Sequence, residues 1–193
     1  MKNYLLAYNA TAFVCWLAYF VSFITSGFQL NDTNVILLAV AQGMAILEIV
    51  HAVLKWVKSP VGSTTAQVFS RLLVLVLILL FYYRYSINSV CYAGIVVVSF
   101  AWSITELVRY SFYFFQLQGK QPDALLWMRY SFFIVLYPIG VTGEWLVMAS
   151  PLFGGLFSLW LYLAVAVPVA LSYLYYFPVL YKYMWKQRRD KLK

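Results

Sequence analysis

The chain has 193 residues, of which 64% are hydrophobic and only 10% are charged, and its net charge is +8. Soluble domains are roughly half apolar and about one quarter charged. This composition, with a mean hydropathy of +0.80, therefore excludes a water-facing surface and indicates an integral membrane protein. In a soluble protein the positive charge would suggest nucleic-acid binding. Here most of it lies in the predicted loops and the tail, so no nucleic-acid partner is expected.

Six apolar segments are long enough to cross a bilayer as α-helices, which takes about 20 residues each. They lie at about 4–26, 34–57, 65–86, 91–117, 123–149 and 156–185. The segments are continuous and lack the alternating pattern of an outer-membrane β-barrel. The sequence therefore predicts an all-α integral membrane protein, with a single domain over residues 1–193 that forms a bundle of six transmembrane helices surrounded by membrane lipid.

Basic residues predict the orientation of this bundle, because short cytoplasmic loops carry an excess of lysine and arginine. In a six-span arrangement nearly all of them fall on one side, and the other side receives only Arg84. The basic side holds Lys2, Lys55, Lys58, Lys120, Lys186, Arg188, Arg189, Lys191 and Lys193. Both termini are therefore predicted to be cytosolic.

Seven ionisable residues lie inside the predicted spans, where each carries an energetic cost and needs a partner or a function. They are Glu48, His51, Arg71, Glu106, Arg109, Arg129 and Glu144. Glu106 and Arg109 are three residues apart and can pair on one helix face, and Glu48 and His51 have the same spacing. We interpret Glu48, His51, Arg71, Glu106 and Arg109 as structural residues that neutralise one another in the bundle interior.

Glu144 differs because no basic residue lies within four positions of it along the chain. It ends the run Tyr137-Pro138-Ile139-Gly140-Val141-Thr142-Gly143-Glu144, whose proline and glycines weaken a helix. Irregular backbone inside a membrane is tolerated only where protein or a cavity surrounds it. An unpaired carboxylate beside such a run predicts a functional site. The alternative is that Glu144 pairs with Arg71 or another distant arginine.

The chain contains 17 tyrosines, most of which are expected to pack or to form a belt at the membrane interface. Those of the last apolar segment are interpreted in this way: Tyr173, Tyr175, Tyr176, Tyr181 and Tyr183. Tyr137 is singled out because it precedes Glu144 by seven residues, which places both on one face of a helix, about two turns apart.

Several kinds of chemistry are excluded by what the sequence lacks. The single histidine excludes a histidine-rich metal site, so no metal is expected, and no GxGxxG follows a strand, which excludes a nicotinamide-binding unit. Cys15 and Cys91 have no CxxC spacing. What remains is proton transfer by a carboxylate and a phenol without a cofactor, as in elimination, addition or isomerisation.

Motifs along nearly the whole chain form a recognisable series. They are Leu47-Glu48-Ile49-Val50-His51-Ala52, Lys58-Ser59-Pro60, Gln67-Val68-Phe69-Ser70-Arg71, Trp102-Ser103-Ile104-Thr105-Glu106, Arg109-Tyr110-Ser111-Phe112-Tyr113, Leu126-Trp127-Met128-Arg129-Tyr130, the run from Tyr137 to Glu144, and Lys186-Gln187-Arg188-Arg189. In this order they resemble the very-long-chain (3R)-3-hydroxyacyl-CoA dehydratases of the endoplasmic reticulum, also called protein-tyrosine-phosphatase-like proteins. The YPxGxxGE motif is the most specific part of the resemblance.

The resemblance implies a lyase of the endoplasmic reticulum membrane that dehydrates (3R)-3-hydroxyacyl-CoA to trans-2-enoyl-CoA in very-long-chain fatty-acid elongation. Its two catalytic residues map onto Tyr137 and Glu144. We assign Glu144 as the base and Tyr137 as the proton donor, and the reverse assignment stays open. No cofactor is implied apart from the CoA of the substrate. The implied partners are the condensing enzyme, the ketoacyl-CoA reductase and the enoyl-CoA reductase.

Two other classes of function stay open. A catalytically inactive scaffold of the elongation complex would keep the fold without turnover. A small-molecule transporter would use Glu48, Arg71, Glu106 and Glu144 as a relay and would predict internal repeats, but residues 1–96 and 97–193 show no convincing repeat. Phosphatase activity has no support, because neither Cys15 nor Cys91 is followed by an arginine six residues later.

The basic side of the bundle predicts where the anionic CoA binds, at Lys55, Lys58, Lys120 and the tail. Arg129 either contacts the CoA arm or extends to the membrane surface. Tyr137 and Glu144 would be about 10.5 Å apart along a regular helix, yet they must act on adjacent carbons. We therefore expect the 137–144 segment to be kinked or partly unwound so that the two residues converge on one cavity. The alternative is that Pro138, Gly140 and Gly143 only ease close helix packing, with the substrate threaded along a straight helix. A regular helix there would return the choice of base to Glu48 or Glu106.

Overall fold

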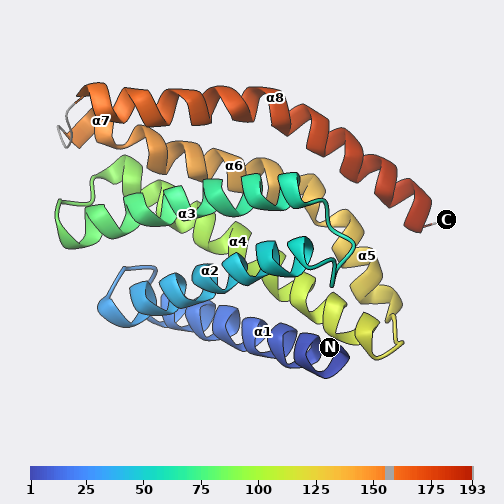
Figure 1. The fold of residues 1–193 in the computed structure, drawn as a ribbon. Coiled ribbons are helices and arrows are strands. Elements are labelled where there is room, and N and C mark those ends of the chain that lie inside the picture. Colours follow the sequence, from blue (N-terminus) through green and yellow to red (C-terminus); the bar gives the residue numbers. More distant parts are fainter. Residues whose placement is uncertain (155–158, 193) are drawn as a thin grey trace.

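The computed structural model describes residues 1–154 and 159–192, and within these ranges it contains only helices and short connections. The helices are α1 (Lys2–Thr25), α2 (Asp32–Val53), α3 (Val61–Tyr83), α4 (Ser89–Leu117), α5 (Asp123–Ser131), α6 (Phe133–Ala149), α7 (Pro151–Gly154) and α8 (Leu159–Lys191). The long helices lie side by side along one axis, and both chain termini lie at the same end (Figure 1). The predicted all-α class is confirmed.

Among the described residues, five segments are long and apolar enough to cross a membrane: α1, α2, α3, α4 and Phe133–Phe153. The first four agree with the predicted spans to within about one helical turn. The fifth begins ten residues later than predicted, because α5 and α6 are separated by a single residue, Phe132, which itself keeps a helical backbone conformation. The span predicted at 156–185 lies partly outside the described residues, and the rest of it belongs to α8.

The C-terminus of α2 shows why this helix stops short of the predicted residue 57. Lys55 adopts a left-handed conformation with a φ of 56°. The N–H of Trp56 then donates to the His51 carbonyl at 2.9 Å, and the N–H of Lys55 donates to the Ala52 carbonyl at 3.1 Å. These two bonds form the Schellman motif that ends many helices. The chain is thereby turned into the loop that carries Lys55 and Lys58.

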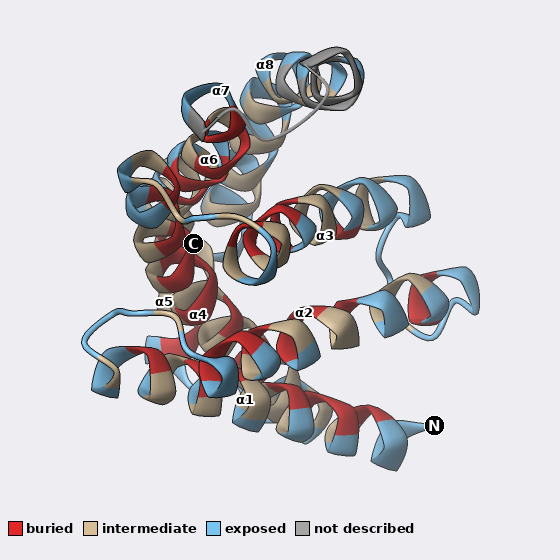
Figure 2. Cartoon of the chain, turned by 90° about the vertical axis from the view of Figure 1, so that its left-hand side faces the viewer, coloured by how far each residue is buried: buried red, intermediate tan, exposed pale blue. Residues whose placement is uncertain are grey.

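Helix α4 lies at the centre of the bundle and packs chiefly against α6 and α1, and its buried face is visible in Figure 2. Its contact with α6 is made at the level of the backbone. A Cβ atom at Gly94 would lie 2.8 Å from the backbone nitrogen of Val147, and one at Gly143 would lie 2.9 Å from that of Val98. Glycine at both positions therefore allows the close approach, which places Glu144 directly beside α4.

The outer surface of the bundle is apolar, whereas polar side chains are buried inside. Large apolar side chains such as Val14, Ile36 and Phe69 are exposed, while Gln42 and Glu106 are buried. Soluble monomers seldom expose so much apolar surface. This distribution is typical of a helix bundle that lies in a bilayer.

Candidate active site

Tyr137 and Glu144 both belong to α6, which runs as a continuous helix through Pro138. The predicted partial unwinding of residues 137–144 is therefore wrong, whereas the predicted kink stays a prediction. Pro138 lacks an N–H and leaves the Ile134 carbonyl without its usual helical partner. The Tyr181 hydroxyl of α8 donates to this carbonyl at 3.2 Å, so the helix passes through the proline with that acceptor satisfied.

The Glu144 side chain is buried, with 7% of its surface exposed, and both of its oxygens accept hydrogen bonds. Oε1 accepts from the indole Nε1–H of Trp102 on α4 at 2.8 Å. Oε2 accepts from the hydroxyl of Tyr173 on α8. Among the described residues Glu144 forms no ion pair, because Arg71, its predicted alternative partner, binds Glu106 at 2.5 Å.

The half-buried Tyr137 ring also faces α8. It stacks on Phe177 with the ring centroids 4.9 Å apart and lies farther from Tyr181, at 6.3 Å. Within residues 1–154 and 159–192 its hydroxyl has no hydrogen-bond partner. The structure thus places both predicted catalytic residues against α8, without a direct bond between them.

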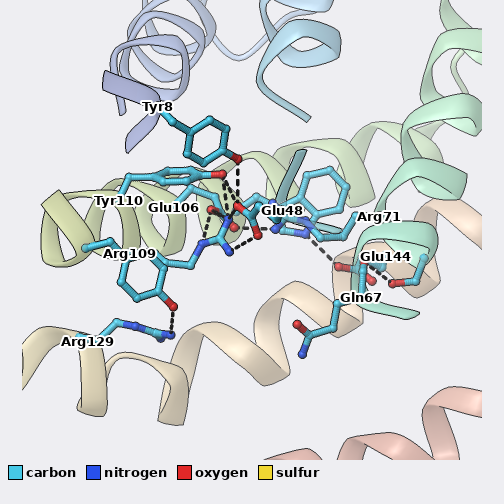
Figure 3. A network of polar contacts seen from close by, with 12 residues as sticks. Tyr8, Glu48, Gln67, Arg71, Glu106, Arg109, Tyr110, Arg129 and Glu144 are labelled. Atoms are coloured by element: carbon cyan, nitrogen blue, oxygen red, sulfur yellow. Dashed lines mark hydrogen bonds and ion pairs between the residues drawn. The ribbon is translucent and has the colours of Figure 1, made fainter. Parts of the chain in front are cut away.

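The buried charges of α2, α3 and α4 form one network (Figure 3). Arg109 donates to both oxygens of Glu48 at 2.6 Å and pairs with Glu106 at 2.5 Å. Arg71 binds the other side of Glu106 at 2.5 Å. The pairing of Glu106 with Arg109 that their spacing predicts is therefore present. Glu48 and Glu106 both form ion pairs with arginine, which makes them poorer candidates for the base than Glu144.

Two tyrosines complete this network around Glu48. The Tyr110 hydroxyl donates to Glu48 Oε1 at 2.6 Å, and the Tyr8 hydroxyl donates to it at 3.4 Å. His51 takes no part. Its Nε2 is 3.0 Å from the Tyr4 hydroxyl, and its ring stacks on Trp56. The pairing of Glu48 with His51 suggested by their spacing is therefore wrong.

The predicted substrate-binding residues lie away from Glu144. Arg129 on α5 approaches the Tyr113 hydroxyl at 3.4 Å and lies over its ring (Figure 3). Lys55, Lys58 and Lys120 are exposed in the two loops at the end of the bundle that also carries both termini (Figure 1). Within the described part of the chain, no group of three or more His, Cys, Asp or Glu side chains is arranged to hold a metal ion.

Two residues that contact the Glu144 carboxylate were not predicted from the sequence. Trp102 begins the motif Trp102-Ser103-Ile104-Thr105-Glu106, but nothing in that motif predicts a hydrogen-bond partner for it. The sequence predicts Tyr173 to be one of the packing tyrosines of the last apolar segment, whereas its hydroxyl binds Glu144, which lies 29 residues away on another helix. The spacing of residues along α8 carries no signal of that contact.

The sequence model of the family described as Protein tyrosine phosphatase-like protein, PTPLA, matches residues 42–193. The chain belongs to the PTPLA family. Over 218 residues this PTPLA protein is 37% identical to the very-long-chain (3R)-3-hydroxyacyl-CoA dehydratase hpo-8 of Caenorhabditis elegans, and the match covers 100% of this chain and 95% of the relative. It is 33% identical to the very-long-chain (3R)-3-hydroxyacyl-CoA dehydratase 2 of Mus musculus, with 98% and 80% covered. No solved structure matches this PTPLA chain.

Proposed function

We propose that this protein catalyses the dehydration of (3R)-3-hydroxyacyl-CoA to trans-2-enoyl-CoA in very-long-chain fatty-acid elongation. The observation that carries the proposal is similarity over the whole chain to relatives named for this dehydratase activity. The site agrees with that chemistry, because α6 directs one carboxylate and one phenol toward α8. Removal of water needs a base and a proton donor.

Glu144 is suited to the role of base. Both of its oxygens accept hydrogen bonds, and each keeps a second acceptor position for a substrate proton. In the proposed step Glu144 takes the proton from C2, next to the thioester carbonyl. The electron pair of that C–H bond forms the C2–C3 double bond as the C3–O bond breaks.

Tyr137 supplies the proton that converts the departing hydroxide into water. Its hydroxyl has no hydrogen-bond partner among the described side chains, so it is free to donate to the 3-hydroxyl of a bound substrate. The step leaves the proton on Glu144 and a phenolate on Tyr137, and return of that proton to Tyr137 restores the starting state. Because Tyr137 and Glu144 lie about two turns apart on a continuous α6, the substrate lies along the α8 side of this helix with C3 toward Tyr137 and C2 toward Glu144, and both side chains must extend toward each other to reach these adjacent carbons.

The rest of the proposal concerns substrate binding and the membrane. CoA phosphates bind Lys55, Lys58, Lys120 and Arg129 at the basic end of the bundle, and the acyl chain enters between the helices. Six spans, with α8 as the sixth, place both termini in the cytosol and the protein in the endoplasmic reticulum membrane. There it works with the condensing enzyme and the two reductases of elongation.

Turnover of a 3-hydroxyacyl-CoA by purified protein tests the activity. We expect dehydration by the wild type and a loss of at least about 100-fold in kcat for Tyr137→Phe and for Glu144→Gln, with normal yield because both changes preserve size. Near-normal turnover in either variant would remove that residue from its role. An inactive but folded wild type would favour the scaffold.

Accessibility of tags tests the arrangement in the membrane. Tags at both termini should be accessible from the cytosol, whereas a cysteine probe in residues 27–31 should be accessible only from the lumen. A lumenal C-terminus would contradict the six-span arrangement.

A further inference from the structure

We propose that Tyr173 and Trp102 are positioning residues, which hold the Glu144 carboxylate in the orientation needed to take a proton from the substrate. The inference rests on the proposed function, in which Glu144 is the base. It adds two residues to the two of the YPxGxxGE motif, and both lie on helices other than α6.

The two donors reach Glu144 from different helices. Trp102 on α4 binds Oε1 at 2.8 Å, and Tyr173 on α8 binds Oε2. One bond would leave the carboxylate free to rotate about its last side-chain bond. Two bonds to different oxygens, from two different helices, fix the plane of the group. Each carboxylate oxygen retains a second acceptor position, so an oxygen stays available for the substrate proton.

The kind of partner distinguishes Glu144 from Glu48 and Glu106, the two carboxylates of the ion network. Glu48 and Glu106 are each bound by arginine at 2.5–2.6 Å, which neutralises their charge. Glu144 is bound by an indole and a phenol, which are neutral donors. They orient the carboxylate without pairing its negative charge, and an unpaired carboxylate is the better base. A purely structural role would be served equally well by an arginine.

Both donors are themselves held in place. The Arg71 guanidinium lies 5.0 Å from the Trp102 ring and 5.6 Å from the Trp16 ring, and Glu106 anchors it. The ion network therefore supports the indole that binds Glu144. Tyr173 precedes Phe177 by one turn of α8, and Phe177 stacks on Tyr137. One face of α8 thus contacts both proposed catalytic residues.

Tyr173→Phe and Trp102→Phe test the inference, because each removes a donor and keeps an aromatic ring. We expect each variant to lower kcat by about 10- to 100-fold, as a misplaced catalytic group does, while KM stays within about two-fold of the wild type because substrate binding is not touched. Both should elute as monodisperse protein in detergent. Tyr176→Phe and Trp127→Phe are the matched controls, since both side chains are more than half exposed, and they should retain wild-type kcat.

The outcomes separate this inference from the proposed function. If wild type turns over, Glu144→Gln does not, and Tyr173→Phe keeps normal kcat, the positioning role is wrong and the dehydratase stands. A rise in KM in place of a fall in kcat would also overturn it. If Tyr173→Phe does not fold, Trp102→Phe decides by the same criteria, and failure of both to fold would assign the two residues to stability alone. A wild type without turnover would reject the proposed function itself.

Discussion

Tyr181 and Pro138 are linked through one acceptor, the carbonyl oxygen of Ile134. The Tyr181 hydroxyl donates to it at 3.2 Å, and an N–H at position 138 would occupy it in a helix without proline. The proline therefore costs α6 one internal bond, which α8 replaces. Through this bond α8 is fixed against α6 one turn before Tyr137.

The first prediction uses this shared acceptor. Tyr181→Phe should destabilise the protein by about 1 kcal/mol, because a partly buried carbonyl loses its donor, which corresponds to a fall of about 2–4 °C in Tm for a chain of this size. In the Pro138→Ala background the same change should have little effect, because residue 138 then supplies the N–H. Thermal unfolding in detergent measures both, and equal losses in the two backgrounds would contradict the shared-acceptor model.

The second prediction concerns the ion network. Arg109→Met leaves Glu48 without an ionic partner, and breaking a buried pair in this way costs about 3–5 kcal/mol. The yield of folded protein should therefore collapse. Arg84→Met is the control, since Arg84 is exposed just after α3 and has no ion pair among the described residues. Full yield with lost turnover in Arg109→Met would instead move Arg109 into the active site.

The third prediction concerns the contact between α4 and α6. Gly143→Ala places a methyl group 2.9 Å from the Val98 backbone nitrogen, and overpacking of this kind costs about 1–3 kcal/mol. Since the helices must separate, turnover should fall as Glu144 moves away from Trp102. Gly43→Ala on α2 is the matched control, because its methyl group meets nothing within 4 Å. Equal Tm values for the two variants would show that the close approach is absent.

The fourth prediction concerns the entrance for CoA. Replacing Lys55, Lys58 and Lys120 by glutamine removes attraction for the phosphates, so KM should rise more than kcat falls, and the difference from wild type should shrink at high salt. Arg84→Gln changes a charge at the opposite end of the bundle and should leave KM unchanged. A fall in kcat at constant KM in the lysine variant would place the entrance elsewhere.

The pattern of apolar and loop residues was sufficient to predict most helices but not the division of the fifth predicted span into α5 and α6 at Phe132. Apolar length and loop residues located α1 to α4, because lipid imposes one helix length on every span. Pro138, Gly140 and Gly143 led to the prediction of partial unwinding at residues 137–144, where α6 is helical. Whether a proline interrupts a helix depends on whether another group donates to the carbonyl that the proline leaves free. Here the donor is Tyr181, which lies 47 residues after Ile134 in the sequence.

The partners of buried polar groups were predictable only within one helix. The spacing of Glu106 and Arg109 correctly indicated a pair, whereas the identical spacing of Glu48 and His51 did not. Glu48 binds Arg109, which is 61 residues away, because α1 packs against both α2 and α4 and so brings the two side chains within reach of each other. Such contacts depend on how whole helices pack against one another, and the periodicity of residues along one helix does not indicate that packing.

The ion network also sets an order for assembly during synthesis. Each of its three ion pairs includes a residue of α4, either Glu106 or Arg109. Glu48 leaves the ribosome 61 residues before Arg109, an interval of about 3–12 s at about 5–20 residues per second. Until then α2 and α3 each carry a charge whose native partner has not been made, and the bilayer penalises both. Completion of α4 is thus the step at which the charges carried by α2 and α3 gain their native partners.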